Sequence, residues 1–161
     1  MDRIGIVDTM FARVDMGAFA IDELKNCPGH GERFEIVHRT VPGFKDLAVA
    51  CKRLIESEHC AILVALGMPG RAEIDQVCAH EASQGIMAAQ LMTSTHILEV
   101  FVHELEEPDH PERLVAVCED RARKHARNAY WLLYEPEQLV RRAGQGVRQG
   151  YGDAGPISSP A

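Results

Sequence analysis

The sequence lacks the features that mark membrane, secreted and nucleic-acid-binding proteins. None of its apolar runs approaches the roughly 18–20 residues needed to cross a bilayer. Its start, MDRIGIVDTM, has no basic region followed by an apolar core, so we expect no secretory signal and a cytoplasmic protein. The net charge of −7 argues against nucleic acid as a partner, because phosphate binding requires a dense basic surface.

Motifs for cofactors and metals are also missing. The sequence contains no G-x-G-x-x-G segment and no G-x-x-x-x-G-K-[ST] segment, so dinucleotide and P-loop functions lose their best support. The five cysteines are irregularly spaced with no C-x-x-C pair, which disfavours a disulfide framework or a zinc site. Cys78 and His80 alone would supply two ligands without a third, and we expect no metal site.

What the sequence does contain is an alternation of strand and helix patterns. β-branched and apolar residues fill segments 4–9, 34–41, 61–67 and 96–103, and helical patterns separate these segments. Residues 47–55 follow the i, i+3, i+4 spacing of an amphipathic helix, and a further apolar stripe includes Ile74, Val77 and Met92. The alternation predicts an α/β three-layer sandwich, in which helices flank a four-stranded parallel sheet.

The chain reads as one domain with a tail. No internal repeat or linker divides residues 1–149, which are long enough to bury a core without disulfides. Residues 150–161 are rich in Gly, Pro and Ser, and we expect this tail to be extended or mobile.

Ligands of open parallel sheets bind at the carboxyl ends of the strands. That rule selects residues 9–13, 41–46, 67–71 and 102–104. Three of these loops lead directly into a helix, so free backbone N–H groups face the cleft. A uracil-like ring suits such groups when an aromatic face is available for stacking. Phe11 offers that face, although an aromatic at this position also serves as a cap on the core.

Charged side chains near these loops are candidates for proton transfer. An acidic residue such as Asp46 in the first turn of a helix is explained by the helix dipole, worth about 0.3–1 kcal/mol. The same dipole does not explain Lys45, because a positive charge is unfavourable at the positive end of a helix. His80 beside Glu81, and His103 at the end of the fourth strand, could each exchange protons, although a lone histidine is more often structural.

Several segments resemble a known family. Residues 41–54 (VPGFKDLAVACKRL), 61–70 (AILVALGMPG) and 79–86 (AHEASQGI) are similar to segments of lumazine synthases. The resemblance is closer to the archaeal-type riboflavin synthases. It covers most of the chain, in five blocks that occur in the right order: 6–16, 40–52, 65–83, 97–104 and 146–156.

The resemblance implies a lumazine synthase-like fold with flavodoxin-like topology, and the conversion of two 6,7-dimethyl-8-ribityllumazine molecules to riboflavin. Lumazine synthases bind a ketose phosphate through a hydroxyl residue and use a nearby histidine, where this chain has Ala72 and Ile74. Three alternatives remain open: a lumazine synthase, a flavin- or lumazine-binding protein without turnover, and a flavodoxin-like signalling domain.

The resemblance also implies roles for individual residues. Phe11 would stack on the ring, Asp46 would bind ribityl hydroxyls, and the backbone of Gly43 would bind the pyrimidine edge. His103 is the first candidate for proton transfer, followed by Lys45, His80 and Glu81. The other expected substrate contacts are Thr9, Ala12, Phe44, Met68, Pro69 and Gly70. A homopentamer with sites between subunits is implied, without an organic cofactor but with assistance from Mg²⁺.

Overall fold

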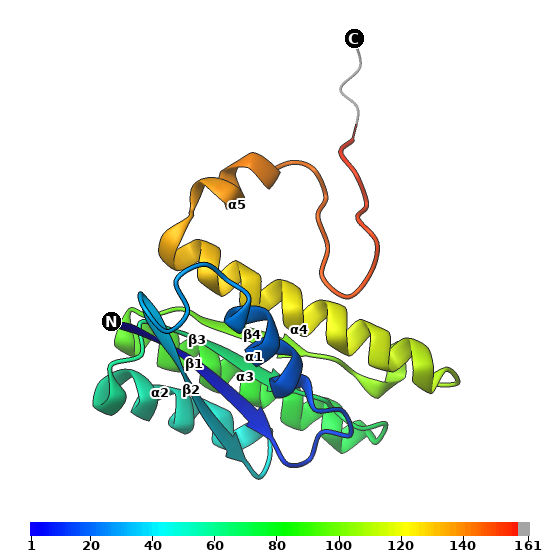
Figure 1. Ribbon diagram of the computed structural model, residues 1–161. Helices are drawn as coiled ribbons and strands as arrows, with labels where there is room; N and C mark the ends of the chain where they lie inside the picture. Colours follow the sequence, from blue (N-terminus) through cyan, green and yellow to red (C-terminus); the bar gives the residue numbers. More distant parts are fainter. Residues whose placement is uncertain (158–161) are drawn as a thin grey trace.

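The computed structural model describes residues 1–157, which form a central sheet with helices on both sides (Figure 1). The strands are β1 (Asp2–Thr9), β2 (Phe34–Val41), β3 (Ile62–Gly67) and β4 (Ile97–Phe101). The helices are α1 (Met16–Lys25), α2 (Leu47–Glu58), α3 (Glu73–Thr93), α4 (Pro111–Tyr134) and α5 (Glu137–Arg142). Two short 3-10 helices, η1 (Phe44–Asp46) and η2 (Glu104–Glu106), follow β2 and β4.

The sheet is parallel and has the strand order β2-β1-β3-β4. This arrangement confirms the predicted α/β class and places β1 and β3 at the centre. All six residues of β3 are buried, as its continuous apolar run predicts for a strand covered on both faces. The fourth strand is shorter than predicted: it ends at Phe101, so His103 lies beyond the strand, just before η2.

Each face of the sheet has its own core. Ile4, Ile6 and Val64 pack under α1 and α4, whereas Val7, Leu63 and Ala65 pack under α2 and α3. Figure 1 shows these two helix pairs on opposite sides of the sheet. Full burial of a side chain of this size contributes about 1.5–3 kcal/mol, so the two cores together fix the sheet between its helices.

Helix α3 carries apolar side chains on two faces. Its buried residues are Ala79, Ala82, Ile86 and Ala89. The predicted apolar stripe that includes Ile74, Val77 and Met92 does not face the sheet, because these side chains are 64%, 45% and 72% exposed. Small alanines allow α3 to approach the sheet, while the larger side chains point away from it. The outer face of α3 is therefore an unpartnered apolar surface in a single chain.

Segment 146–151 is fastened to α4. The guanidinium of Arg121 donates to both carboxylate oxygens of Glu106, at 2.9 and 2.8 Å, and to the carbonyl of Gln149 at 3.3 Å. Asp120 accepts from the backbone N–H of Gly150 at 2.7 Å. Residues 152–157 then run away from the body without helix or strand (Figure 1). Within residues 1–157, no helix is long and apolar enough to span a membrane.

Candidate functional site

The loop after β1, residues 10–15, lies at the carboxyl edge of the sheet and borders three cavities. We name them the Phe11 cavity, the Asp8 cavity and the Glu104 cavity; their volumes are about 240, 290 and 220 Å³. Arg13 and Val14 line both of the latter two, and Phe11 lines the first. The edge at which the sequence predicts binding residues thus has three cavities. Each is slightly smaller than a usual ligand pocket.

The Phe11 cavity collects four of the nine predicted substrate-binding residues. Its lining includes Phe11, Gly43, Phe44 and Asp46. The ring of Phe11 is 49% exposed and meets Phe44 edge-on, with ring centroids 5.6 Å apart. Phe44 is buried against Phe101, and Gly67 makes room for it, because a Cβ there would lie 2.9 Å from the Phe44 ring. Phe11 therefore rests on a fixed aromatic base with about half of its surface open, and it is not buried as a cap on the core would be.

The turn that carries Asp46 is organised by its own side chain. The carboxylate oxygen Oδ2 of Asp46 accepts from the backbone N–H of Gly43 at 3.2 Å, which closes η1. Asp46 remains exposed and lines the cavity beside Phe11. The carboxylate thus combines a capping contact with access to a ligand, and the backbone N–H of Gly43 is already engaged.

Lys45 lines this cavity and pairs with Glu81, and His80 precedes Glu81 on α3. Lys45 Nζ and Glu81 Oε2 are 2.6 Å apart, and the hydrogen bond to Glu81 raises the pKa of Lys45. All three residues are exposed. An exposed lysine neutralised by a carboxylate is a poor proton acceptor, so this pair suits ligand orientation or a subunit contact better than proton abstraction.

The loop after β3 is more closed than predicted. Met68, Pro69 and Gly70 are buried. The carbonyl of Pro69 accepts from Glu104 N at 3.0 Å, and that of Gly70 accepts from Gln76 Nε2 at 2.7 Å. The carbonyls of two predicted substrate contacts, Pro69 and Gly70, are therefore used within the protein, and Met68 lines the Glu104 cavity.

A buried carboxylate lies between two arginines in the Glu104 cavity. Glu104 is 7% exposed; its Oε2 is 3.1 Å from Arg13 Nη1 and 3.7 Å from Arg71 Nε. Arg71 also donates to the carbonyl of Pro108. Glu104 thus partly neutralises the guanidiniums of Arg13 and Arg71, which an anionic ligand in this cavity would otherwise meet.

His103 is held by an amide. Its Nδ1 is 2.5 Å from Gln76 Oε1, and its backbone N–H donates to Glu106 Oε2 at 2.9 Å. The hydrogen bonds from Arg121 and His103 to Glu106 outweigh the effect of burial and lower the pKa of this carboxyl. His103 is thus fixed in orientation at the edge of the sheet, as its predicted role requires, but its ring has an amide partner instead of a carboxylate.

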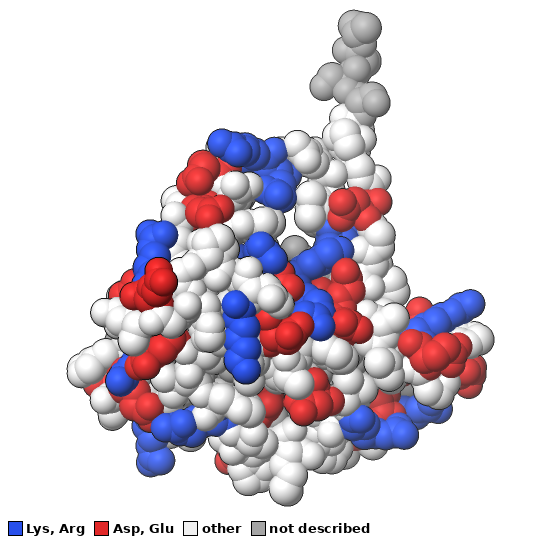
Figure 2. Space-filling view, viewed as in Figure 1, with Lys and Arg blue, Asp and Glu red and all other residues white. Residues whose placement is uncertain are grey.

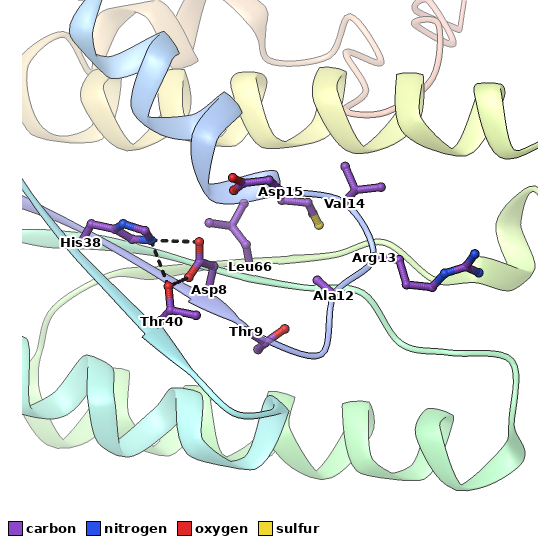
Figure 3. A pocket seen from close by; sticks show the side chains of 10 residues that line it. Asp8, Thr9, Ala12, Arg13, Val14, Asp15, His38, Thr40 and Leu66 are labelled. Atoms are coloured by element: carbon purple, nitrogen blue, oxygen red, sulfur yellow. Dashed lines mark hydrogen bonds and ion pairs between the residues drawn. The ribbon is translucent and has the colours of Figure 1, made fainter.

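The Asp8 cavity contains a polar cluster that the sequence analysis missed. Asp8 Oδ1 accepts from Thr40 Oγ1 at 2.6 Å, and Asp8 Oδ2 is 2.9 Å from His38 Nε2 (Figure 3). The predicted contacts Thr9 and Ala12 line this cavity and not the Phe11 cavity. The hydroxyl of Thr9 is buried and has no hydrogen-bond partner among residues 1–157.

A signal for this cluster is present in the sequence. Asp8 interrupts the end of an apolar strand, and His38 and Thr40 alternate with period two, which places them on one face of β2. The register pairs Ile6 with His38 and Asp8 with Thr40. Only the strand order makes β1 and β2 neighbours, so the cluster could not be assembled without the topology.

No metal site is evident in the described residues, and no basic surface is evident on the face that Figure 2 shows. Among residues 1–157, no group of three or more His, Cys, Asp and Glu side chains could hold a metal ion. Figure 2 shows basic and acidic side chains interspersed over the face in view, without a dense basic patch there. That face offers no surface suited to a polyanion.

Comparison with known proteins gives consistent similarities. A model of the 6,7-dimethyl-8-ribityllumazine synthase family matches residues 2–135. A riboflavin synthase of Methanothermobacter thermautotrophicus is 59% identical over 157 residues, which cover 98% of this chain and 100% of that protein. The riboflavin synthase of Methanothermobacter marburgensis is 58% identical with the same coverage. The riboflavin synthase of Aeropyrum pernix is 47% identical over 96% of this chain and 97% of that protein.

Proposed function

Because the chain belongs to the 6,7-dimethyl-8-ribityllumazine synthase family, and its full-length relatives are named riboflavin synthases, we propose that it is a riboflavin synthase. It is an enzyme of the transferase class. The reaction converts two molecules of 6,7-dimethyl-8-ribityllumazine to riboflavin and 5-amino-6-(D-ribitylamino)uracil. A four-carbon unit moves from one ring to the other, and no redox step is needed.

The observation that carries this choice over lumazine synthesis is the first turn of α3. Ala72 occupies the N-cap without a side-chain hydrogen bond, and Ile74 is exposed where the resemblance expects a histidine. Glu73 and Asp75 place two carboxylates in that turn. A helix N-terminus with acidic side chains and no hydroxyl is a poor anchor for a phosphate, which this site does not need if its reactant is a lumazine.

The cavities suit the roles that we assign to the predicted residues. Phe11 stacks on a lumazine ring, and Asp46 accepts hydrogen bonds from the ribityl chain. Holding two rings next to each other supplies most of the catalysis, because the reacting atoms of two bound molecules need no further encounter. His103, oriented by Gln76, contributes to proton transfer beyond the end of β4.

We also propose a homopentamer, located in the cytoplasm, with sites between subunits. The exposed apolar side chains Ile74, Val77, Leu91 and Met92 lie on the face of α3 that is turned away from the sheet. Such a face is buried in an assembly of identical chains. The small cavities at the sheet edge would then be completed by a neighbour's residues. Sedimentation analysis of the wild type and of Leu91→Lys tests this assembly: a monomeric wild type contradicts it.

Magnesium assistance is a separate proposal. Mg²⁺ binds through few protein carboxylates and keeps several water molecules, so it would act as a weakly held ion near the substrate. Treatment with EDTA followed by added Mg²⁺ tests this. Turnover that falls with EDTA and returns with Mg²⁺ supports the proposal, and unchanged turnover contradicts it.

The deciding experiment supplies 6,7-dimethyl-8-ribityllumazine alone to the purified protein. Formation of riboflavin and ribitylaminouracil in equal amounts, without any ketose phosphate, is the expected result. A protein that needs ketose phosphate and ribitylaminouracil to form lumazine is a lumazine synthase. A protein that binds the lumazine and leaves it unchanged is a carrier, and either outcome refutes the proposed function.

A further inference from the structure

The polar cluster of the Asp8 cavity has no place in the roles assigned above. Asp8 belongs to the central strand β1, and its side chain is only 13% exposed. Thr40 Oγ1 and His38 Nε2 both reach this carboxylate, so each of its oxygens has one partner. Three polar side chains from two strands thus converge on one point of a cavity, as Figure 3 shows.

The backbone of α1 is shaped to accept this cluster. A Cβ atom at Gly17 would lie 2.0 Å from Asp8 Oδ2 and 3.4 Å from His38 Nε2. Any side chain at this position would displace the carboxylate. The absence of a Cβ therefore allows the Asp8–His38 pair to form under the first turn of the helix.

The pair determines the tautomer of His38. A carboxylate accepts hydrogen bonds and cannot donate one, so the hydrogen of the neutral imidazole lies on Nε2. Nδ1 then carries the lone pair, and it has no hydrogen-bond partner among residues 1–157. Asp8 thus fixes which ring nitrogen of His38 is free to accept a proton, as in other carboxylate–imidazole pairs. His38, with a side chain 40% exposed, is accessible to a ligand.

The other histidines near the sheet edge lack this arrangement. The ring of His103 contacts the amide of Gln76, and His80 is exposed on α3. Neither ring has a carboxylate partner in the described part of the chain.

The Asp8 cavity also suits a heterocycle. Its volume is about 290 Å³, and Val14 and Leu66 provide apolar walls beside the polar cluster. Thr9, 6% exposed, contributes a hydroxyl that has no partner within residues 1–157. The loop that presents Phe11 on one side presents Ala12 to this cavity. A reaction between two lumazines needs two recesses next to each other, and this loop has one on each side.

We propose that the Asp8 cavity receives one of the two lumazines and that His38 accepts the ring-methyl proton, with Asp8 as its positioning residue. This inference rests on the proposed function. The methyl C–H bond breaks, the proton passes to Nδ1 of His38, and the electron pair is delocalised into the ring. Protons lost from ring methyl groups reappear on the nitrogens of the released uracil, so the overall reaction consumes none.

The test separates proton removal from overall turnover. Exchange of the lumazine methyl hydrogens in D₂O is followed by NMR, with the enzyme-free rate subtracted, and riboflavin formation is measured in parallel. His38→Gln keeps a side chain of similar length that cannot take up the proton, and it is expected to lower both rates on the order of 10²-fold. The control is His96→Gln, an exposed histidine at the opposite end of the sheet, which is expected to leave both rates unchanged.

Two further variants keep the test decisive. His38→Ala removes the ring from beside Asp8, and added imidazole is expected to restore at least part of the exchange rate. Asp8→Asn is expected to lower the exchange rate while the Kd for lumazine changes less than about threefold, because the positioning residue acts through His38.

The outcomes distinguish a failure of the proposed function from a failure of the role of His38. A wild-type protein that forms no riboflavin from lumazine refutes the proposed function. If the wild type is active and His38→Gln retains both rates within twofold, the role of His38 is refuted while the function stands. A His38→Gln protein that binds lumazine more weakly but exchanges and turns over normally at saturation also refutes the proton-transfer role.

Discussion

The imidazole of His125 makes the stability of the fold sensitive to mild acid. His125 lies on α4, and its Nδ1 is buried without a partner among residues 1–157. Burial, reinforced by the nearby charge of Arg121, lowers the pKa of this side chain from 6.5 to about 4. The folded protein therefore keeps His125 neutral at pH values where the unfolded chain binds a proton.

The sign and size of the effect follow from this difference. Between pH 6.5 and pH 4 the unfolded chain binds more protons, so the free energy of unfolding falls as the pH falls through that window. From pH 7 to pH 5 the expected loss attributable to His125 is about 2 kcal/mol. Replacement by Phe removes the titration and keeps a flat ring in the same space.

Urea unfolding followed by circular dichroism, at one protein concentration, measures the difference. The wild type is expected to lose about 2 kcal/mol more than His125→Phe between pH 7 and pH 5, or roughly 1 M in urea midpoint. His96→Gln, an exposed histidine, serves as the control and is expected to behave as the wild type does. If wild type and His125→Phe lose stability in parallel, the reasoning about burial is wrong.

Three further predictions concern the sheet edge. Phe11→Ala is expected to weaken lumazine binding by about 1–3 kcal/mol in a fluorescence titration, the scale of aromatic stacking on a base, and an unchanged Kd would remove Phe11 from the site. Asp46→Asn can still accept from Gly43 N, so assembly measured by sedimentation is expected to persist while kcat falls; wild-type kinetics would leave Asp46 with a capping role alone. Gly17→Ala is expected to lower stability by about 1–3 kcal/mol in thermal melts, because its Cβ would overlap Asp8 Oδ2, and an unchanged Tm would contradict that packing.

Local sequence patterns predicted the helices and strands better than they predicted which face of each helix is covered. The continuous apolar run of β3 identified a strand buried on both sides, and its alternation with helices identified the parallel sheet. The stripe that includes Ile74 and Met92 indicated a helix but not what covers that face, because the same stripe fits a helix that meets a sheet or another subunit. Periodicity reports that a face is apolar and does not report what covers it.

Some residues of the candidate site were predicted from the sequence, and others were identified only in the structure. Phe11, Gly43 and Asp46 were found from sequence because they follow strand ends, and parallel strands bring their carboxyl ends to one edge. Asp8 and His38 were not found, because they are 30 positions apart and become neighbours only through the pairing of β1 with β2. Pro69 and Gly70 were predicted to contact the substrate, and in the structure their carbonyls accept hydrogen bonds from Glu104 N and Gln76 Nε2.

By itself, the sequence determined the α/β class and the family, since these depend on the order of strands and helices along the chain and on short segments with fixed spacing. The tertiary structure alone decided which polar groups meet, which donors and acceptors remain free, and which apolar face stays open. Those properties arise from contacts between distant residues, where tenths of an ångström and the presence or absence of one Cβ atom determine whether a carboxylate can reach an imidazole.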